Sequence, residues 1–360
     1  MNLEPLNLPH AEGFPPILAG PCSAETEEQV MATAAALAAL GFSIFRAGVW
    51  KPRTKPGGFE GVGEAALPWL QRVKRETGML VAIEVATPDH VKAARQYGID
   101  IFWIGARTTA NPFAVQALAD CMGETDIPVL VKNPLSPDIE LWIGALQRLN
   151  RAGVKRLAAI NRGFSFYGPH LYRNLPMWQV SVELRRRYPQ LPVFCDPSHI
   201  AGRADLIESL CQQALDMAFD GLIIESHCRP GEAWSDAEQQ VTPERLHRIL
   251  SRVEVRNGGV LPEGIVELRR QIDEIDARIV EILAERMTVS RKIGTWKKTH
   301  NMTVLQSRRY NEILDRREAQ ALQKDMNAMF VKKVFACIHE ESVRQQIEIM
   351  KPHAKDGIEA

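Results

Sequence analysis

The sequence lacks the features of a membrane, secreted or nucleic-acid-binding protein. No stretch of its 360 residues approaches the roughly 18 consecutive apolar residues of a membrane helix, and residues 1–15 show no basic segment followed by an apolar run. The 44 Lys and Arg residues balance 44 Asp and Glu residues, so no broad positive field is available to hold a polyanion. We therefore expect a soluble cytoplasmic protein that acts on neither a membrane nor nucleic acid.

Cysteine is scarce, and its spacing does not suggest pairs. In a reducing compartment, scattered cysteines are expected to remain thiols rather than form a disulfide framework. One of them is a candidate metal ligand. The six are Cys22, Cys121, Cys195, Cys211, Cys228 and Cys337.

The chain length suggests a barrel of about 250 residues followed by a smaller unit. From residue 16 to about residue 231, short apolar runs alternate with amphipathic stretches, which is typical of repeated βα units and a parallel sheet. About eight such runs are present, as a closed (β/α)8 (TIM) barrel requires. The runs are residues 17–21, 43–47, 80–85, 101–105, 129–131, 156–160, 193–195 and 221–224.

A polar or charged residue stands at the C-terminal end of nearly every run. An open doubly wound sheet would place ligand-binding residues mainly at one switch point, whereas a barrel gathers them from all its strands at one mouth. The recurrence therefore favours the barrel. The residues are Cys22, Arg46, Glu84, Arg107, Lys132, Arg162, His199 and Glu225.

The composition of the sequence changes after residue 255. Gly- and Pro-containing turn residues are followed by long stretches almost without Gly or Pro. We predict a barrel domain over residues 1–256, a linker over 257–264, a helical domain over 265–350 and a disordered polar tail over 351–360. Apolar residues spaced three and four apart predict a long helix from 265 to about 293. Two more helices are predicted at 307–322 and 327–350.

Three of the strand-end residues are candidate metal ligands. Cys22, His199 and Glu225 end the first, seventh and eighth runs, which become neighbours when the barrel closes, and Asp236 lies in the loop after the eighth. Taken singly, each residue is more often structural, but their convergence at one rim favours a site. A thiolate, imidazole and carboxylate set suits one divalent ion such as Mn, Fe, Co or Zn and disfavours Mg.

The same rim carries a concentration of cations. Arg107, Lys132 and Arg162 end consecutive runs, and Arg46, Lys51 and Arg53 accompany the second. Their donors match phosphate and carboxylate groups, so we predict multiply anionic substrates. The alternative is an ion-pair network in which Glu84, Glu60 or Asp196 neutralises some of the cations.

Five motifs stand in this order along the chain: Gly20-Pro21-Cys22-Ser23, Lys51-Pro52-Arg53-Thr54, Gly105-Ala106-Arg107, Asp196-Pro197-Ser198-His199 and Ser235-Asp236. Together they resemble 3-deoxy-D-arabino-heptulosonate 7-phosphate (DAHP) synthase over residues 16–250. The resemblance implies that Arg107, Lys132 and Arg162 hold phosphoenolpyruvate, with Arg46 and Lys51 also in reach. It implies that Lys51, Arg53 and Thr54 hold erythrose 4-phosphate, and that Cys22, His199, Glu225 and Asp236 hold the metal.

The resemblance also implies a mechanism. The metal polarises the aldehyde oxygen, the enol carbon of phosphoenolpyruvate attacks the carbonyl, water adds at the former enol carbon and phosphate leaves. Lys51 and a water on the metal are the candidate proton donors. The alternative is the related octulosonate 8-phosphate synthase, which uses a five-carbon aldehyde phosphate; the Lys51-Pro52-Arg53-Thr54 motif resembles the enzymes for the four-carbon substrate.

Polar residues stand on a face of the helical region that should be apolar. Arg286 falls on the seam of the long helix, Lys297 lies about three turns beyond it, and Ser342 and Gln346 share one face of the last helix. Two cations on a buried face predict an anionic ligand. The alternative is that Arg286 pairs with an acid such as Glu341.

The helical region resembles the all-helical chorismate mutases over residues 265–350. The match rests on Leu268-Arg269, Ala284-Glu285-Arg286, Lys297, Arg309, Ser342 and Gln346. It implies that Arg269, Arg286 and Arg309 hold the carboxylates of chorismate. It also implies that Lys297 and Gln346 face the breaking ether oxygen, with Ser342 adding a hydrogen bond.

Two further expectations concern assembly and regulation. Arg269 and Lys297 are 28 residues apart, about 42 Å along a straight helix, so both can serve one ligand only in an intertwined homodimer formed by the C-terminal helices. Gln306 and Tyr310 stand where relatives commonly have acids, which leaves two hypotheses open: an active mutase, or a module that senses prephenate or chorismate. We expect feedback on the barrel to act through this domain, by prephenate binding.

Overall fold

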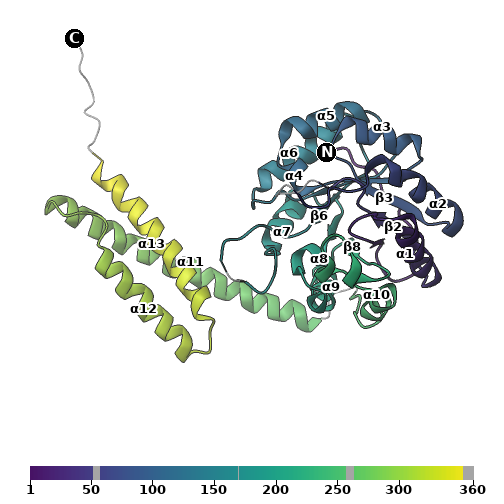
Figure 1. The fold of residues 1–360 in the computed structure, drawn as a ribbon. Helices are drawn as coiled ribbons and strands as arrows, with labels where there is room; N and C mark the ends of the chain where they lie inside the picture. The colour runs from purple at the N-terminus through teal and green to yellow at the C-terminus, as the bar shows by residue number, and fades with distance from the viewer. Residues whose placement is uncertain (52–56, 169, 257–262, 352–360) are drawn as a thin grey trace, which may run out of the picture. The chain divides into compact units, whose positions relative to one another are not determined.

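The structure, a computed structural model, describes residues 1–51, 57–168, 170–256 and 263–351. The chain divides into two compact units, Met1–Asn257 and Gly258–Ala360 (Figure 1). The predicted substrate residues Arg53 and Thr54, most of the predicted linker and nearly all of the predicted tail lie outside the described residues.

The first unit is a closed barrel of eight parallel strands, as predicted. Consecutive strands pair in parallel, and β1 also pairs with β8, which closes the sheet. The strands are buried on both faces, which explains why each is a short apolar run. Their bounds are β1 Ile17–Gly20, β2 Ile44–Ala47, β3 Leu80–Glu84, β4 Ile101–Ile104, β5 Val129–Lys132, β6 Leu157–Asn161, β7 Val193–Cys195 and β8 Gly221–Glu225.

Helices cover the outside of the barrel (Figure 1). Several begin at a residue whose side chain accepts a hydrogen bond from a backbone N–H of the first turn, including Thr26, Asn111, Asp138 and Thr242. The helices are α1 Glu27–Ala39, α2 Leu67–Thr77, α3 Pro88–Gln96, α4 Ala106–Thr109, α5 Pro112–Met122, α6 Ile139–Arg151, α7 Trp178–Arg187, α8 Pro197–Ala201, α9 Ile207–Asp216 and α10 Pro243–Leu250, with 3-10 turns η1 Gly63–Ala66, η2 Ala204–Leu206, η3 Pro230–Glu232 and η4 Ala237–Gln239.

The N-terminal segment closes one end of the barrel. Leu6 and Leu8 belong to the same buried cluster as the inward-facing Trp103 and Phe194. The segment is fixed by a hydrogen bond from the Glu4 N–H to the Lys155 carbonyl, 3.1 Å, just before β6 begins. Because the N-terminal ends of the strands are covered in this way, the polar C-terminal ends form the accessible mouth.

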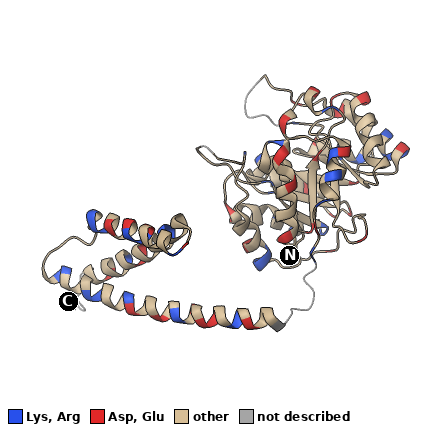
Figure 2. Cartoon of the chain, turned by 90° about the horizontal axis from the view of Figure 1, so that it is seen from below, with Lys and Arg blue, Asp and Glu red and all other residues tan. Residues whose placement is uncertain are grey.

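The second unit consists of three helices, as predicted: α11 Glu263–Thr299, α12 Ser307–Gln323 and α13 Ala328–Met350. The C-terminal part of α11 packs against α13, but residues 264–282 are exposed within the chain, including Leu268, Ile272 and Ile279. Figure 2 shows acidic and basic residues interspersed along α11. None of the described helices combines the length and apolar character needed to span a bilayer.

Candidate active sites

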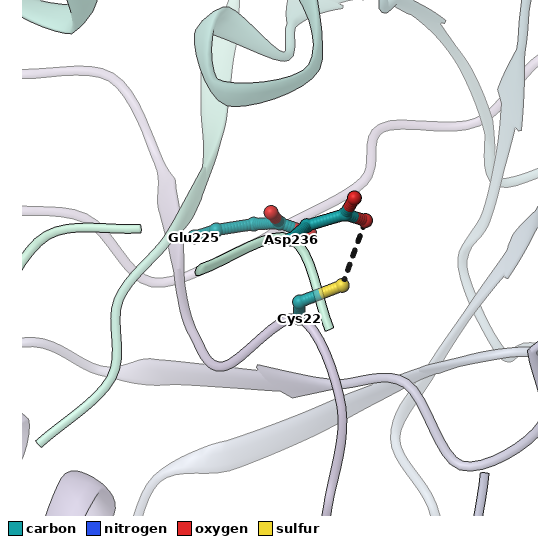
Figure 3. Close-up of side chains that lie close together, drawn as sticks. All are labelled: Cys22, Glu225 and Asp236. Carbon is teal, nitrogen blue, oxygen red and sulfur yellow. Dashed lines mark hydrogen bonds between the residues drawn. The ribbon is translucent and has the colours of Figure 1, made fainter. Parts of the chain in front are cut away.

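Three of the four predicted metal ligands meet at the seam between the first and last strands. Cys22 follows β1, Glu225 ends β8, and the pairing of Gly20 with Glu225 brings the two strand ends together. Asp236 lies in the loop after β8. One ligand atom from each of the three residues lies within 4.8 Å of those of the other two, and the Cys22 thiol is 3.3 Å from Asp236 Oδ2 (Figure 3).

The loop that carries Asp236 is held against the start of the barrel. Ser235 Oγ lies 2.5 Å from Ser23 Oγ, and the Cys22 N–H donates to Gln240 Oε1 at 2.9 Å. Asp236 itself adopts the left-handed conformation, with φ 49° and ψ 39°, which is uncommon for a residue other than glycine. These contacts keep the Asp236 carboxylate directed at Cys22.

The chemistry of this cluster fits a divalent cation. Burial, reinforced by the nearby Glu225 and Asp236 carboxylates and opposed by Lys51, raises the pKa of the Cys22 thiol to about 12. As a thiolate, Cys22 would repel the two neighbouring carboxylates, and a bound cation would offset that repulsion and favour loss of the thiol proton. Sulfur among the ligands favours Mn, Fe, Co or Zn over Mg.

His199, the fourth predicted ligand, lies beside the cluster rather than within it. It belongs to the short helix α8, and its Nε2 is 3.7 Å from Glu225 Oε1. Its Nδ1 is 2.8 Å from Asp196 Oδ2. Burial lowers the pKa of His199, which favours the neutral ring. With the proton on Nδ1, the nitrogen beside Asp196, Nε2 would be available to bind a cation.

A pocket next to the cluster gathers four of the predicted substrate-binding cations. Lys51, Arg107, Lys132 and Arg162 line it together with Glu84, His199 and Asp236. Lys51 connects this pocket to the cluster of candidate metal ligands, because its Nζ donates to Cys22 Sγ at 3.3 Å. One surface thus presents both the cations and two of the predicted metal ligands.

Arg46 does not line this pocket. Its side chain is 1 % exposed and donates from Nη1 to Glu225 Oε1 at 3.1 Å and from Nη2 to the Cys22 carbonyl at 3.3 Å. The guanidinium also lies over the Trp103 ring, 4.8 Å from its centroid. In the structure Arg46 therefore supports two members of the cluster of Cys22, Glu225 and Asp236.

The cations that line the pocket differ in whether a carboxylate balances their charge. Lys132 forms a buried ion pair with Asp196, 2.8 Å. Arg162 is also buried, but its side chain donates to the neutral oxygens of Asn174, 2.8 Å, and Gly163, 3.4 Å. Burial lowers the pKa of Arg162 to about 10; the nearby Asp196 carboxylate opposes this shift, and the charges of Arg173 and Arg107 add to it. An anion bound here would relieve this cost.

The helical unit contains a second pocket, of about 540 Å3, a size common for small-molecule sites. Arg286 donates to Ser342 Oγ at 2.6 Å, and Lys297 donates to Gln346 Oε1 at 3.1 Å. No carboxylate is found among the described residues that line it. The polar lining residues are Arg286, Ser290, Lys297, Gln306, Arg309, His339, Ser342 and Gln346.

The remaining predicted residues of the helical unit lie elsewhere. Arg269 stands on the exposed part of α11 and does not line the pocket. The Glu341 carboxylate, the suggested partner of Arg286, instead accepts hydrogen bonds from Arg344 and Gln345, each at 2.7 Å. Tyr310 stacks obliquely on His339, with ring centroids 4.5 Å apart.

Two polar residues that line the pocket of the helical unit were missed by the sequence analysis. Ser290 Oγ accepts from Gln346 Nε2 at 3.0 Å, and its position four residues after Arg286 on the same helix face was a usable signal. His339 lies three residues before Ser342 on α13. Its pKa is lowered by burial and by the charges of Arg286 and Lys297.

Comparison with known proteins matches each of the two units to a different family. The family model described as DAHP synthetase I family matches residues 12–257, and that described as chorismate mutase type II matches residues 268–347. The phospho-2-dehydro-3-deoxyheptonate aldolase of Thermotoga maritima is 32% identical over 241 residues, which are 67% of this chain and 69% of that protein. A 2-dehydro-3-deoxyphosphooctonate aldolase of Dechloromonas aromatica is 26% identical over 274 residues, covering 70% of this chain and 95% of that protein.

Solved structures give the same result. The crystal structure of the Thermotoga maritima phospho-2-dehydro-3-deoxyheptonate aldolase superposes with a TM-score of 0.60 at 31% identity, covering 67% of this chain and 68% of that one. The closed eight-stranded barrel, its cationic mouth and these matches lead to one conclusion: the chain is an enzyme of the DAHP synthetase I family that carries a C-terminal chorismate mutase type II domain.

Proposed function

We propose that the barrel is a cytoplasmic enzyme that condenses phosphoenolpyruvate with erythrose 4-phosphate to give DAHP and phosphate, the first step of the shikimate pathway. One divalent ion (Mn, Fe, Co or Zn) would be held by Cys22, His199, Glu225 and Asp236. The observation that carries the proposal is a single pocket in which Lys51, Arg107, Lys132 and Arg162 lie beside this ligand set.

The arrangement of cations supports distinct roles for the side chains. A bound metal would supply Lewis-acid polarisation of the aldehyde oxygen. Arg107, Lys132 and Arg162 bind the phosphate and carboxylate of phosphoenolpyruvate, while Lys51, at the border with Cys22, lies in reach of both substrates and is a candidate proton donor. Holding the two anionic reactants between fixed cations removes association entropy and screens their mutual repulsion. Carbon–carbon bond formation, addition of water and loss of phosphate then follow.

The identity of the aldehyde can be tested directly. Several relatives are octulosonate aldolases, but the family match and the higher identity to the heptonate aldolase support the four-carbon substrate. Phosphate release should be measured from phosphoenolpyruvate with erythrose 4-phosphate or with a five-carbon aldose phosphate, each with and without a chelator. Chelator-sensitive release with the four-carbon aldehyde is expected. Release with only the five-carbon aldehyde, or release unaffected by chelator, would contradict the proposal.

We further propose that the helical domain converts chorismate to prephenate. Arg286 and Arg309 hold carboxylates, and Lys297 with Gln346 donates to the ether oxygen as negative charge develops there. A pocket whose described lining has cations and no carboxylate suits a dianion. The second candidate is a prephenate or chorismate sensor. Loss of mutase turnover in Arg286→Ala supports catalysis, whereas unchanged turnover points to the sensor.

We also propose a homodimer formed through α11. This helix is continuous from Glu263 to Thr299, which places Arg269 about 42 Å from Lys297. The apolar side chains of residues 264–282 are exposed within the chain and would be covered by a second copy. Arg269 of the partner subunit would then complete the pocket.

Feedback on the barrel is proposed to act through the same helical domain, with prephenate as the effector. The domain supplies an anion-binding pocket separate from the barrel site. Removing the residues after 256 should leave condensation intact and abolish its inhibition by prephenate. Inhibition that persists in the isolated barrel would reject this role.

A further inference from the structure

The loop between β6 and α7 contacts both the cluster of candidate metal ligands and the neighbouring pocket lined by cations. Its residues Arg173 and Asn174 are adjacent in the sequence. Asn174 is 6% exposed, whereas the Arg173 side chain is half exposed. Between them they contact two predicted metal ligands and one predicted substrate-binding cation.

Asn174 uses both ends of its amide group. Its Oδ1 accepts from Arg162 Nη1 at 2.8 Å, and its Nδ2 donates to the backbone carbonyl of His199 at 2.7 Å. Its own N–H donates to the Ile200 carbonyl at 3.2 Å. One buried side chain therefore bridges the guanidinium of Arg162 and helix α8, which carries His199.

The backbone around Asn174 is firmly fixed. Phe164 and Leu175 form a two-way backbone bridge with N–O distances of 2.8 and 2.9 Å, which pins the base of the loop. Gly163, with φ 77°, approaches so closely that a Cβ there would lie 2.7 Å from Asn174 Cβ. The Asn174 amide therefore has little freedom to move.

Arg173 extends the same connection to the other side of the metal-ligand cluster. Its Nη1 donates to Asp236 Oδ1 at 2.9 Å and to Gln239 Oε1 at 2.8 Å. Its backbone N–H donates to the Ala201 carbonyl at 3.2 Å. The two residues thus link the loop after β8, helix α8 and Arg162.

We propose that Asn174 is a positioning residue that couples Arg162 to helix α8 and so fixes the substrate-binding guanidinium relative to the metal ligand His199. The inference rests on the proposed condensation, in which phosphate and aldehyde must be held in a fixed relation. An arginine side chain has many rotamers. By accepting a hydrogen bond from Arg162, Asn174 Oδ1 favours one of them and so orients the planar guanidinium group before the substrate binds. Misplacement of a reacting group by about 1 Å can cost on the order of a hundredfold in rate.

The test compares Asn174→Asp and Asn174→Ala with the parent protein. Asn174→Asp has the same shape but places a carboxylate against Arg162 that competes with the substrate anion. Leu171→Ala is the matched control, because Leu171 belongs to the same loop and its side chain is 59% exposed. Each full-length protein is loaded with Co2+, and the sulfur-to-cobalt absorption band is used to follow metal affinity against a competing chelator. Binding of phosphoenolpyruvate is then measured by calorimetry without the aldehyde, so no turnover occurs.

A graded result is expected. Asn174→Asp should raise the Kd for phosphoenolpyruvate by about tenfold to a hundredfold and Asn174→Ala by about threefold to tenfold, while Leu171→Ala should match the parent. Asn174→Ala should also weaken Co2+ binding by about tenfold, as loss of an outer hydrogen bond to a ligand-bearing element does. In both Asn174 variants, kcat should fall by more than the change in melting temperature explains, whereas kcat of Leu171→Ala should match that of the parent.

Two outcomes would overturn the role of Asn174. The first is a folded Asn174→Asp protein that binds phosphoenolpyruvate as tightly as the parent. The second is an equal loss of affinity for phosphoenolpyruvate in both Asn174 variants, in proportion to the drop in their melting temperatures. That result would indicate a structural role only. If the parent itself shows neither a sulfur-to-cobalt band nor phosphoenolpyruvate binding, the proposed condensation fails instead.

Discussion

Replacing Arg269 with alanine should inactivate the chorismate mutase domain, although this residue lies outside the pocket of its own chain. The reason is geometric, since Arg269 and Lys297 stand about 42 Å apart on one continuous helix. Loss of a hydrogen-bonded charge at a carboxylate costs about 1.5–3 kcal/mol. We therefore expect chorismate turnover at subsaturating substrate to fall by about tenfold to more than a hundredfold.

Mixing this variant with Arg286→Ala should then restore activity. If equal amounts exchange subunits at random, about half of the dimers are mixed, and each mixed dimer has one site with both arginines, so about a quarter of all sites are complete. The assay is the loss of chorismate absorbance after unfolding and refolding the two variants together. Arg286→Ala mixed with Arg309→Ala is the control, because these two residues line the same pocket of one chain, and no complete site can form.

Two results would refute the reasoning. Full activity of Arg269→Ala alone would show that the residue does not contact the substrate. No recovery on mixing, with both variants inactive and dimeric, would show that Arg269 and Arg286 act within one chain.

Three shorter predictions concern the barrel. Cys22→Ser should abolish the sulfur-to-cobalt absorption band and weaken metal binding at least tenfold, as measured by chelator competition; an unchanged band would exclude Cys22 as a ligand. Gly163→Ala should lower the free energy of unfolding by about 1–3 kcal/mol, because of its positive φ and its contact with Asn174; an unaltered denaturation midpoint would show that the loop relaxes. Arg46→Met should lower the free energy of unfolding by about 3–5 kcal/mol, because the buried Glu225 would lose its guanidinium partner and keep the neutral amide of Gln239. A calorimetric scan showing no loss would contradict this role of the ion pair.

The barrel was predictable because its strands are buried on both faces and therefore read as apolar runs. Even the differences in strand bounds have a physical cause. Lys132 and Glu225 were placed just beyond their runs, yet they belong to β5 and β8, since the strands continue into the polar mouth. The proximity of Cys22 and Glu225 followed from barrel closure, because closure makes β1 and β8 neighbours. Closure does not place Asp236, which lies in a loop, and His199 lies beside the cluster rather than within it.

The contacts of loop residues were not predictable in the same way. Arg173 and Asn174 lie in a segment with no periodicity, and the partner of Arg173, Asp236, is 63 residues away. Arg46 illustrates a second limit. Its position at a strand end correctly placed it near the site, but only the packed structure shows that it faces Glu225 rather than the substrate pocket. Sequence spacing locates a residue at the mouth without giving the direction of its side chain.

The pairing of the first strand with the last has a consequence for how the enzyme matures. Cys22 and Glu225 are 203 residues apart, so the proposed metal site does not exist until nearly the whole barrel has been synthesised and its ring has closed. A metal bound there would act as a cross-link across that ring and, at about a hundredfold excess over its Kd, would stabilise the closed form by roughly 2.7 kcal/mol. When the cell lacks the metal, newly made chains would therefore be affected first. Their barrels would open more readily between β1 and β8.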